Sequence, residues 1–330
     1  MKKIIVIGGS GFIGSVLIDD LINSGYSVAN IDVNLYGNTS SLKHIKSKKL
    51  INIHKDFKNF KIINNLINRG YSKIIFLAGL VGDPISKKYP ELSRKIMLDN
   101  TKNLIKFLNK KKNMVSNFFF VSTCSNYGLD KTNKLLGEGS KLKPLSIYSK
   151  CKVNIEKFLS KNKINYTILR FSTAFGMSKR MRFDLTINQF VKDIFLKKKL
   201  IIYDKDTYRP YLHTKDFSRL FLILLKTKKK ISKEIFNVGG NKNNFSKQDI
   251  LKKILKKIKS KNIEFKDFDH DKRNYKVNFS KVLNRLNFKP KYSVEYGINE
   301  ILNNLKRNKK LRKNLEIYKN QNIKWNIKKS

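Results

Sequence analysis

A glycine-rich turn close to the N-terminus constrains the fold of this 330-residue chain more than any other feature. The apolar run 3–7 has the pattern of a buried strand, and apolar residues recur at helical spacing after the turn. Glycines at such a junction let backbone N–H groups and the helix N-terminus approach a pyrophosphate. A merely flexible loop is disfavoured because strand and helix patterns flank the turn on both sides. The turn predicts a dinucleotide site, with expected cofactor contacts at Gly8, Gly11, Phe12, Ile13 and Gly14.

The first half of the chain alternates between short apolar stretches and amphipathic stretches. Short buried strands that alternate with helices predict a parallel sheet covered on both faces, which is an α/β doubly wound (Rossmann) fold. The predicted strands are 3–7, 27–31, 51–54, 74–77, 117–122 and 166–171, and the predicted helices are 12–24, 62–68, 92–109 and 148–160.

After Gly176 this alternation changes, and the part after Gly240 reads as mostly helical and rich in Lys. We expect residues 1–176 to form the NAD-binding domain, with residues 205–240 contributing to it. Residues 177–330 are then expected to form mainly a smaller, partly interleaved α/β substrate domain. Predicted helices here are 185–196, 215–225, 248–259 and 298–306, with strands at 200–203 and 235–240.

The formal net charge of +48 would suit a partner such as nucleic acid or an anionic membrane. Only 11 of the 72 basic residues are Arg, however, and the Lys residues are spread along the whole chain. Proteins that read phosphates or bases usually favour Arg. The charge is therefore interpreted as solvated surface Lys with a general attraction for anionic substrates, and nucleic acid is not the expected partner.

The cellular setting expected from the sequence is the cytoplasm. Two cysteines, Cys124 and Cys151, are too few for a disulfide framework. The N-terminal apolar run is short and is interrupted by glycines and then by Asp19 and Asp20, unlike a signal peptide. No stretch has the roughly 18 uninterrupted apolar residues of a membrane helix, so no membrane association is expected.

Two acidic residues follow predicted strands where a dinucleotide would bind. Asp32 lies at the end of the second strand, where a carboxylate accepts hydrogen bonds from ribose hydroxyls and repels a 2′-phosphate. This position favours NAD over NADP. Asp56 follows the third strand and is expected to contact the adenine amino group, with a helix-capping role as the alternative.

Tyr148 and Lys152 are four residues apart in a predicted helix, which places both side chains on one face. A phenol with an ordinary pKa near 10 is a poor base at neutral pH. A neighbouring ammonium and a positive nicotinamide ring would lower this pKa by stabilising the phenolate. Thr123 ends the fifth predicted strand, at the sheet edge where ligands bind, and its hydroxyl could hold the substrate oxygen.

Together these motifs resemble a known family. Residues 3–305 resemble the extended short-chain dehydrogenase/reductases, and specifically the NAD-dependent nucleotide-sugar epimerase/dehydratase family. The resemblance rests on the glycine turn, Leu77-Ala78-Gly79, the Ser-Thr-x-x-x-Tyr-Gly segment ending at Gly128, the Tyr148/Lys152 pair, and the segments 169–176, 209–213 and 236–240.

The resemblance implies roles for individual residues. Thr123, Tyr148 and Lys152 would carry the chemistry, and Leu77, Ala78 and Gly79 would line the cofactor. Arg209 would contact the nucleotide-sugar, and Arg273 would hold its diphosphate, since guanidinium groups suit phosphate. No metal site is expected. The family also implies a homodimer formed through helices 92–109 and 148–160.

The residues after Thr123 bear on the type of reaction. Family members that act as 4,6-dehydratases resemble one another in an acid pair directly after the catalytic Thr, because elimination needs an acid and a base. Here those positions are Cys124 and Ser125. We therefore expect epimerisation, at C4, through a transient 4-keto intermediate. A 4-ketoreductase would use the same residues, and a dehydratase is the further alternative within the family.

Two departures from the family pattern point to an unusual substrate. Residues 172–174 read Ser-Thr-Ala where many members have Asn, and residues 178–184 are unusually rich in Arg. We expect Thr173 and Arg182 to face a sugar that carries an extra negative group. A basic nucleic-acid binder on the same fold is the alternative from another class, but it would not need the intact Thr123, Tyr148 and Lys152.

Overall fold

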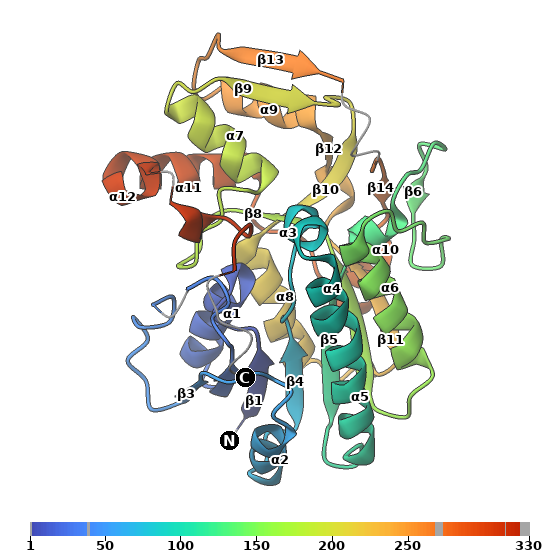
Figure 1. The fold of residues 1–330 in the computed structure, drawn as a ribbon. Coiled ribbons are helices and arrows are strands. Elements are labelled where there is room, and N and C mark those ends of the chain that lie inside the picture. The colour runs from blue at the N-terminus through green and yellow to red at the C-terminus, as the bar shows by residue number, and fades with distance from the viewer. Residues whose placement is uncertain (1, 38–39, 268–272, 314, 324–330) are drawn as a thin grey trace.

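The computed structural model describes residues 2–37, 40–267, 273–313 and 315–323. Its centre is a sheet of seven strands, all paired in parallel, in the order β11-β7-β5-β4-β1-β2-β3 (Figure 1). The order reverses direction at β1, as in a doubly wound sheet. The strands are β1 (Lys3–Ile7), β2 (Ser27–Ile31), β3 (Leu50–Ile53), β4 (Lys73–Phe76), β5 (Asn117–Thr123), β7 (Tyr166–Phe171) and β11 (Glu234–Val238).

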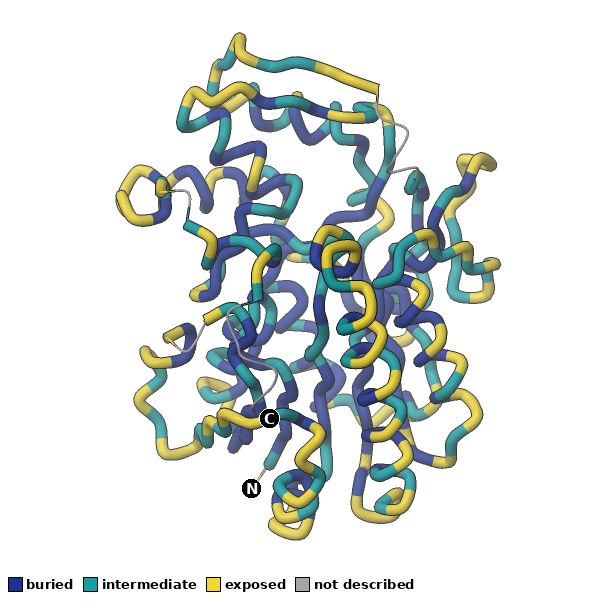
Figure 2. The backbone as a smooth tube through the Cα atoms, in the orientation of Figure 1, coloured by how far each residue is buried: buried dark blue, intermediate teal, exposed yellow. Residues whose placement is uncertain are grey.

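Helices cover both faces of this sheet, which confirms the predicted fold class. On one face, α1 (Phe12–Asn23), α8 (Thr214–Lys226) and α10 (Ser280–Leu286) pack against the sheet in one apolar cluster. On the other face, α2 (Phe60–Asn68), α5 (Thr101–Lys110) and α6 (Ile147–Ser160) form a second cluster. The sheet strands other than the edge strand β3 are largely buried, while the outer sides of α2 and α5 are exposed (Figure 2). Burial on both faces explains the near-continuous apolar strands.

The helix expected over 92–109 is instead built from three segments. It consists of α4 (Pro90–Arg94), a π-helical turn η1 (Lys95–Asn100) and α5. Pro90 fits the first helical position, where its missing N–H costs nothing, so the helix starts earlier than expected. Within the turn, the Thr101 hydroxyl donates to the Ile96 carbonyl oxygen at 3.1 Å. Single π turns occur inside otherwise continuous α-helices, and the sequence pattern did not distinguish this turn from the helix around it.

The second half of the chain builds a smaller region beside the carboxyl ends of the central strands (Figure 1). Three short strands form one sheet there, and two further strand pairs flank it. The elements are β8 (Thr173–Phe175), β9 (Leu200–Tyr203), β10 (Tyr208–His213), β12 (Asn244–Ser246), β13 (Ile263–Lys266), the pair β14 (Lys276–Val277) and β6 (Leu135–Leu136), and the helices α7 (Thr186–Phe195), α9 (Lys247–Leu255), α11 (Val294–Arg307) and α12 (Lys309–Arg312). A third apolar cluster joins the three-stranded sheet and the pair β9–β13 to the four helices, whereas the pair β14–β6 packs against the first cluster.

The expectation of a mostly helical C-terminal part was therefore wrong in detail. Strands β12, β13 and β14 have two to four residues each and pair with distant parts of the chain. Such short strands show too little alternation to be recognised locally. Between β10 and the C-terminal region the chain returns to the central sheet, because β11 pairs with β7. The two regions are thus interleaved along the sequence.

Short helical segments complete the described chain. Two of them, α3 (Asp83–Lys88) and η2 (Cys124–Tyr127), follow β4 and β5 directly at the carboxyl edge of the sheet. The others are η3 (Asn241–Asn243) and η4 (Glu316–Tyr318). Within the described ranges, none of the helices has the length and apolar character needed to cross a membrane.

Candidate active site

A cavity of about 400 Å³ lies at the carboxyl edge of the central sheet and reaches the second region of the chain. Every residue that the sequence singled out as a site residue lines it. The cavity therefore brings together residues that are widely separated in the sequence, from Gly8 to Arg273. The role of each residue stays a prediction. These residues are Gly8, Gly11, Phe12, Ile13, Gly14, Asp32, Asp56, Leu77, Ala78, Gly79, Thr123, Tyr148, Lys152, Thr173, Arg182, Arg209 and Arg273.

The glycine turn forms one end of the cavity between β1 and α1. Gly8 has φ +85°, and a Cβ there would lie 2.6 Å from the backbone nitrogen of Ala78. A Cβ on Gly14 would lie 2.5 Å from the backbone of Gly9, so the helix packs against the turn. At Gly11 the nearest atom to a Cβ would be the Gly8 carbonyl oxygen at 3.4 Å. Gly8 and Gly14 are thus needed for packing, whereas Gly11 leaves room for a ligand.

Asp32 lies beside this turn with its carboxylate already oriented. The backbone N–H of Ser10 donates to Oδ2 at 2.9 Å, and that of Asn34 donates to Oδ1 at 2.7 Å. Burial raises the pKa of Asp32, while these two hydrogen bonds lower it. Each carboxylate oxygen keeps capacity to accept a further hydrogen bond. The arrangement fits the ribose hydroxyls of a dinucleotide and would repel a 2′-phosphate.

Asp56 lines the same end of the cavity but does not cap a helix. Its Oδ1 accepts the backbone N–H of Lys58 at 2.8 Å. The N-terminus of α2 is capped instead by Asn59, whose side chain accepts from Ile62 N–H. The helix-capping alternative for Asp56 is therefore wrong, and its contact with adenine stays a prediction.

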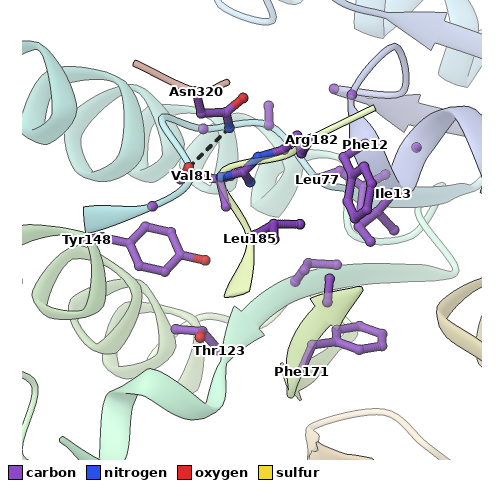
Figure 3. A pocket seen from close by; sticks show the side chains of 18 of the residues that line it. Phe12, Ile13, Leu77, Val81, Thr123, Tyr148, Phe171, Arg182, Leu185 and Asn320 are labelled. Carbon is purple, nitrogen blue, oxygen red and sulfur yellow. Dashed lines mark hydrogen bonds between the residues drawn. The ribbon is translucent and has the colours of Figure 1, made fainter. Parts of the chain in front are cut away.

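Tyr148, Thr123 and Lys152 converge at the other end of the cavity. Tyr148 and Lys152 lie one turn apart on α6, which begins with a capping box between Ser146 and Ser149. The hydroxyl of Tyr148 points into the cavity, toward the end of β5 that carries Thr123 (Figure 3). The Lys152 ammonium is buried and donates to the Val121 carbonyl oxygen at 2.7 Å.

The effect of these neighbours on the Tyr148 phenol differs from the expectation. Within the chain, burial and then the charge of Asp83 raise the pKa of Tyr148, while Arg182 and the Thr123 hydroxyl lower it. Lys152 is not among the groups that dominate this shift, and its Nζ lies 5.9 Å from the Tyr148 ring centre. Burial lowers the pKa of Lys152 itself to about 8. The chain alone therefore does not acidify the phenol, because it buries the side chain in a low-dielectric cavity.

The three arginines predicted to bind substrate come from different segments. Arg182 points toward the middle of the cavity, and its guanidinium forms a two-pronged ion pair with Asp184 at 2.7 and 2.9 Å (Figure 3). Arg209, on β10, lies with its guanidinium 5.6 Å from the ring centre of Tyr275. Arg273 pairs with the carboxylate of Asp83, which opens helix α3.

A buried polar network lies directly beneath the catalytic residues. Arg170 on β7 and Glu156 on α6 form an ion pair at 2.7 Å, with side chains only 4% and 5% exposed. Glu156 also accepts from Asn126 at 2.8 Å and from the Ser122 hydroxyl at 2.5 Å. The network ties α6 to the end of β5, and this fixes Tyr148 relative to Thr123.

Several cavity residues escaped the sequence analysis, among them the polar residues Asp83, Arg180 and Asn320. Asp83 follows the Leu77-Ala78-Gly79 segment and could have been noticed as an acid near the sheet edge. Arg180 was part of the Arg-rich stretch but was not separated from Arg182. Asn320 lies in a polar C-terminal stretch whose sequence carries no signal for a site.

Comparison with protein families decides the identity of this arrangement. Residues 4–239 match the family model described as the NAD dependent epimerase/dehydratase family. The chain belongs to this family. The match covers the glycine turn, the catalytic segment and β11, and it confirms the resemblance inferred from the motifs.

Relatives within the family include both epimerases and dehydratases. UDP-glucuronate 4-epimerase of Thermodesulfobacterium geofontis is 27% identical over 96% of this chain and 100% of that protein. dTDP-glucose 4,6-dehydratase of Shigella flexneri is 26% identical over 90% of each chain. The crystal structure of UDP-glucuronic acid 4-epimerase from Bacillus cereus, in complex with UDP-glucuronic acid and NAD, superposes with a TM-score of 0.80. It shares 27% identity and covers 92% of this chain and 99% of that one.

The cofactor of this epimerase/dehydratase chain is NAD, and its residues fit that molecule. At the glycines of the turn, a diphosphate would meet backbone atoms and no side chain. Asp32 presents a fixed carboxylate for the ribose hydroxyls. The chain is thus an NAD-dependent enzyme of the epimerase/dehydratase family. Whether it isomerises or dehydrates its substrate depends on residues beyond the cofactor site.

Proposed function

We propose that this chain is a 4-epimerase of a nucleoside diphosphate sugar. The observation that carries the proposal is the environment of the residue after Thr123. Cys124 is buried, its thiol donates to the Arg170 carbonyl oxygen at 3.1 Å, and burial raises its pKa. Such a thiol is neither an acid nor a base for a sugar in the cavity. The chain therefore has Tyr148 for oxidation at C4 but lacks the acid after Thr123 that elimination uses.

The proposed mechanism assigns one task to each side chain. When bound, NAD would supply a reversible hydride acceptor for C4, and the glycine turn and Asp32 would hold it. Tyr148 removes the proton of the C4 hydroxyl, and the Thr123 hydroxyl holds that oxygen by a hydrogen bond. Tyr148 gives the proton back to the same oxygen when C4 is reduced from its opposite face. Proton and hydride both return to the sugar, so the reaction has no net redox change.

The lowered pKa that Tyr148 needs in order to act as a base must arise when the cofactor is bound. Burial alone raises the pKa of the phenol, as the surroundings of Tyr148 show. A positive charge beside the phenolate stabilises it and lowers this pKa. We propose that Lys152 and Arg182 provide part of that charge and that the oxidised nicotinamide ring provides the rest.

The substrate part of the proposal rests on cationic side chains along the cavity. Arg209 and Arg273 are proposed to bind the diphosphate, and Arg273 would then exchange its contact with Asp83 for a phosphate oxygen. Thr173 and Arg182 are proposed to face the sugar. Because Arg182 lies in the cavity near Tyr148, an acidic sugar such as a hexuronate is favoured over a neutral hexose. The similarity to UDP-glucuronate 4-epimerases supports this choice.

Incubation of the NAD-loaded protein with a panel of UDP- and dTDP-hexoses and hexuronates tests the proposal. Proton NMR should show interconversion of C4 epimers, with UDP-hexuronates turned over faster than UDP-hexoses and no net formation of NADH. A 4-keto-6-deoxy product would identify a dehydratase instead. Stoichiometric consumption of NADH with a 4-keto sugar would identify a ketoreductase. Either outcome would overturn the epimerase assignment.

We further propose that the enzyme is a cytoplasmic homodimer. Both cysteines are free and buried, which suits a reducing compartment. The proposed interface pairs α4, η1, α5 and α6 with the same elements of a second copy. Sedimentation equilibrium should give twice the monomer mass, and a monomer at micromolar concentration would contradict this assembly.

A further inference from the structure

Several polar atoms along the cavity are buried without a hydrogen-bond partner among the described residues, and two of them belong to residues that contact distant segments of the chain. These two atoms are Nη1 of Arg180 and Oδ1 of Asn320. The two residues are 4% and 7% exposed, and both line the cavity that contains the glycine turn. A buried donor or acceptor without a partner costs about 1–3 kcal/mol, and more for a charged group. A ligand in the cavity would remove that cost by supplying one acceptor and one donor.

Arg180 is held against the helix at whose N-terminus the diphosphate binds. The Arg180 backbone N–H donates to Ser178 Oγ at 3.2 Å, and Ser178 Oγ donates to the Phe12 carbonyl oxygen at 2.7 Å. The same Ser178 hydroxyl contacts Ser15 Oγ in α1 at 2.9 Å. The loop that carries Arg180 is thus fastened to the first turn of α1. Its guanidinium lies 4.9 Å from the ring centre of Tyr36.

The charge of Arg180 has no dedicated counterion in this environment. Arg182 takes both oxygens of Asp184 at 2.7 and 2.9 Å. Asp32 attracts Arg180 electrostatically, but its oxygens accept the backbone N–H groups of Ser10 and Asn34. Burial and then the charge of Arg182 lower the pKa of Arg180 to about 10. An anionic ligand would compensate the charge of Arg180, and the diphosphate is the anionic part of NAD.

Asn320 belongs to a C-terminal segment, residues 315–323, which we call the strap. Two backbone carbonyl oxygens of the strap accept hydrogen bonds from the Arg-rich loop. The Phe183 N–H donates to the Tyr318 carbonyl oxygen at 2.8 Å. Arg180 Nη2 donates to the Lys319 carbonyl oxygen at 3.3 Å. The Asn320 N–H donates to Asp184 Oδ2 at 3.0 Å. The strap thus holds Arg180 in place from the side opposite α1.

The strap also reaches across to the nucleotide-binding half. The side-chain amide of Asn320 donates to the Val81 carbonyl oxygen at 3.1 Å, just after the Leu77-Ala78-Gly79 segment (Figure 3). Beyond it, Asn322 accepts from Lys88 in α3, and Ile323 packs in a cluster with Leu35 and Leu80. The strap therefore contacts both the Arg-rich loop and the nucleotide-binding half of the chain.

We propose that the strap closes the cofactor site and retains NAD, with Arg180 binding the diphosphate and Asn320 accepting a hydrogen bond from a hydroxyl or amide of the cofactor. Both residues are positioned by contacts to both halves of the chain. Retention matters for an enzyme that returns the hydride to the sugar it came from, because an exchanging cofactor would be lost in its reduced form.

Release of NADH from the cofactor-loaded full-length protein tests the proposal without any sugar substrate. NADH fluorescence is followed after mixing with excess ADP-ribose, which also contains the diphosphate. Arg180→Met should accelerate release roughly 10-fold to 100-fold, as expected for the loss of a hydrogen bond to a charged group. Asn320→Ala should accelerate it roughly 3-fold to 10-fold, as for a neutral hydrogen bond.

The controls separate cofactor binding from a purely structural role. Gln321→Ala changes the neighbouring strap residue, which does not line the cavity, and should leave release within about 2-fold of wild type. Arg180→Lys keeps the charge and should recover part of the retention. If Arg180→Met and Asn320→Ala lower the thermal midpoint of the cofactor-free protein but release NADH at the wild-type rate, the strap is only structural and the proposal is wrong.

A comparison of NAD with NADP, which carries an additional 2′-phosphate, provides a further test of the proposal. If Arg180 binds the diphosphate, Arg180→Met weakens NAD, NADP and ADP-ribose by the same factor. A selective loss of NADP affinity would place Arg180 at a 2′-phosphate and would overturn the diphosphate assignment. Because these are binding measurements, their failure would leave the 4-epimerase assignment standing, and failure of epimerisation would leave the strap intact.

Discussion

Tyr148 faces two opposing demands at the scale of a single residue. The pKa of its hydroxyl must lie near neutral pH for proton exchange with a sugar. Burial in the cavity, however, raises this pKa. Lys152, the expected source of acidity, uses its ammonium to hold the Val121 carbonyl oxygen. The surrounding charges, including Arg182 and Asp83, act in opposite directions. This balance makes the cofactor charge the deciding contribution.

Replacement of Tyr148 by Phe removes the proton-transferring hydroxyl and keeps the ring. Turnover of the epimerisable substrate should fall by at least about 100-fold, the lower end of general acid–base contributions. NAD affinity should change little, because the ring still fills the same space. Steady-state kinetics and NAD titration measure the two effects. Activity near that of wild type would mean that the active site is assigned to the wrong residues.

The linked titration of Tyr148 gives a prediction about pH. The pKa of the phenol is raised in the chain alone and must fall when NAD binds, so binding releases a proton near neutral pH. Because protons are released, NAD affinity should rise as the pH increases. An indicator dye measures the release on mixing NAD with cofactor-free protein. Tyr148→Phe should release measurably less, and equal release from both proteins would contradict the assignment.

Some of the predicted site residues that line the cavity could be found from local patterns, such as Gly8 and Gly14 in a turn, Asp32 at a strand end, and Tyr148 on a helix face. Others, such as Arg209 and Arg273, were indicated only by the family resemblance. Arg180 and Asn320 differ, because their place depends on contacts between segments more than 130 residues apart. No local pattern specifies such contacts, and the sequence therefore could not assign these two residues.

At the scale of elements, the glycines between β1 and α1 have two different roles. Gly14 allows close packing of the helix against the turn, and Gly11 leaves room for a ligand. Gly11→Ala should lower the free energy of unfolding by about 1 kcal/mol or less, since it only changes an N-cap, but should weaken NAD binding. Gly14→Ala should cost about 1–3 kcal/mol, because its Cβ would overlap the Gly9 backbone. Urea unfolding and NAD titration of both variants separate the effects. Equal destabilisation by both would contradict this division.

Helix α6 and strand β7 are coupled by the buried Glu156–Arg170 pair. Glu156→Gln leaves the Arg170 charge buried without its carboxylate and should lower the free energy of unfolding by roughly 3–5 kcal/mol. The matched control is Glu234→Gln, which removes a partly exposed partner of Lys281 and should cost less than about 1 kcal/mol. Urea denaturation measures both. Similar costs would mean that the network does not hold α6.

Elements were predicted best where their sequence pattern is long. The central strands and helices α1, α6 and α8 lie within a few residues of the expected ranges. The strands of the second region were mostly missed because each contributes only a few residues and pairs with remote partners, as β13 does with β9. Their stability comes from tertiary packing rather than from local propensity.

For the whole molecule, the interleaved path of the chain explains how one cavity collects residues from both halves. Strand β11 completes the central sheet, while β8 and β10 lead Thr173 and Arg209 to the carboxyl edge of that sheet. The expected division into a nucleotide side and a sugar side follows from the change of sequence pattern near Gly176 and stays a prediction. The sequence carries no comparable signal for the strap.

Transient oxidation at C4 with return of the same hydrogen is the central claim, and isotope labelling tests it most directly. A UDP-sugar substrate carrying deuterium at C4 is converted by NAD-loaded enzyme and both epimers are analysed by mass spectrometry and NMR. The account predicts that deuterium stays at C4 in both epimers and does not pass to added NAD. Loss of the label to solvent or to added NAD, with epimerisation still proceeding, would contradict it.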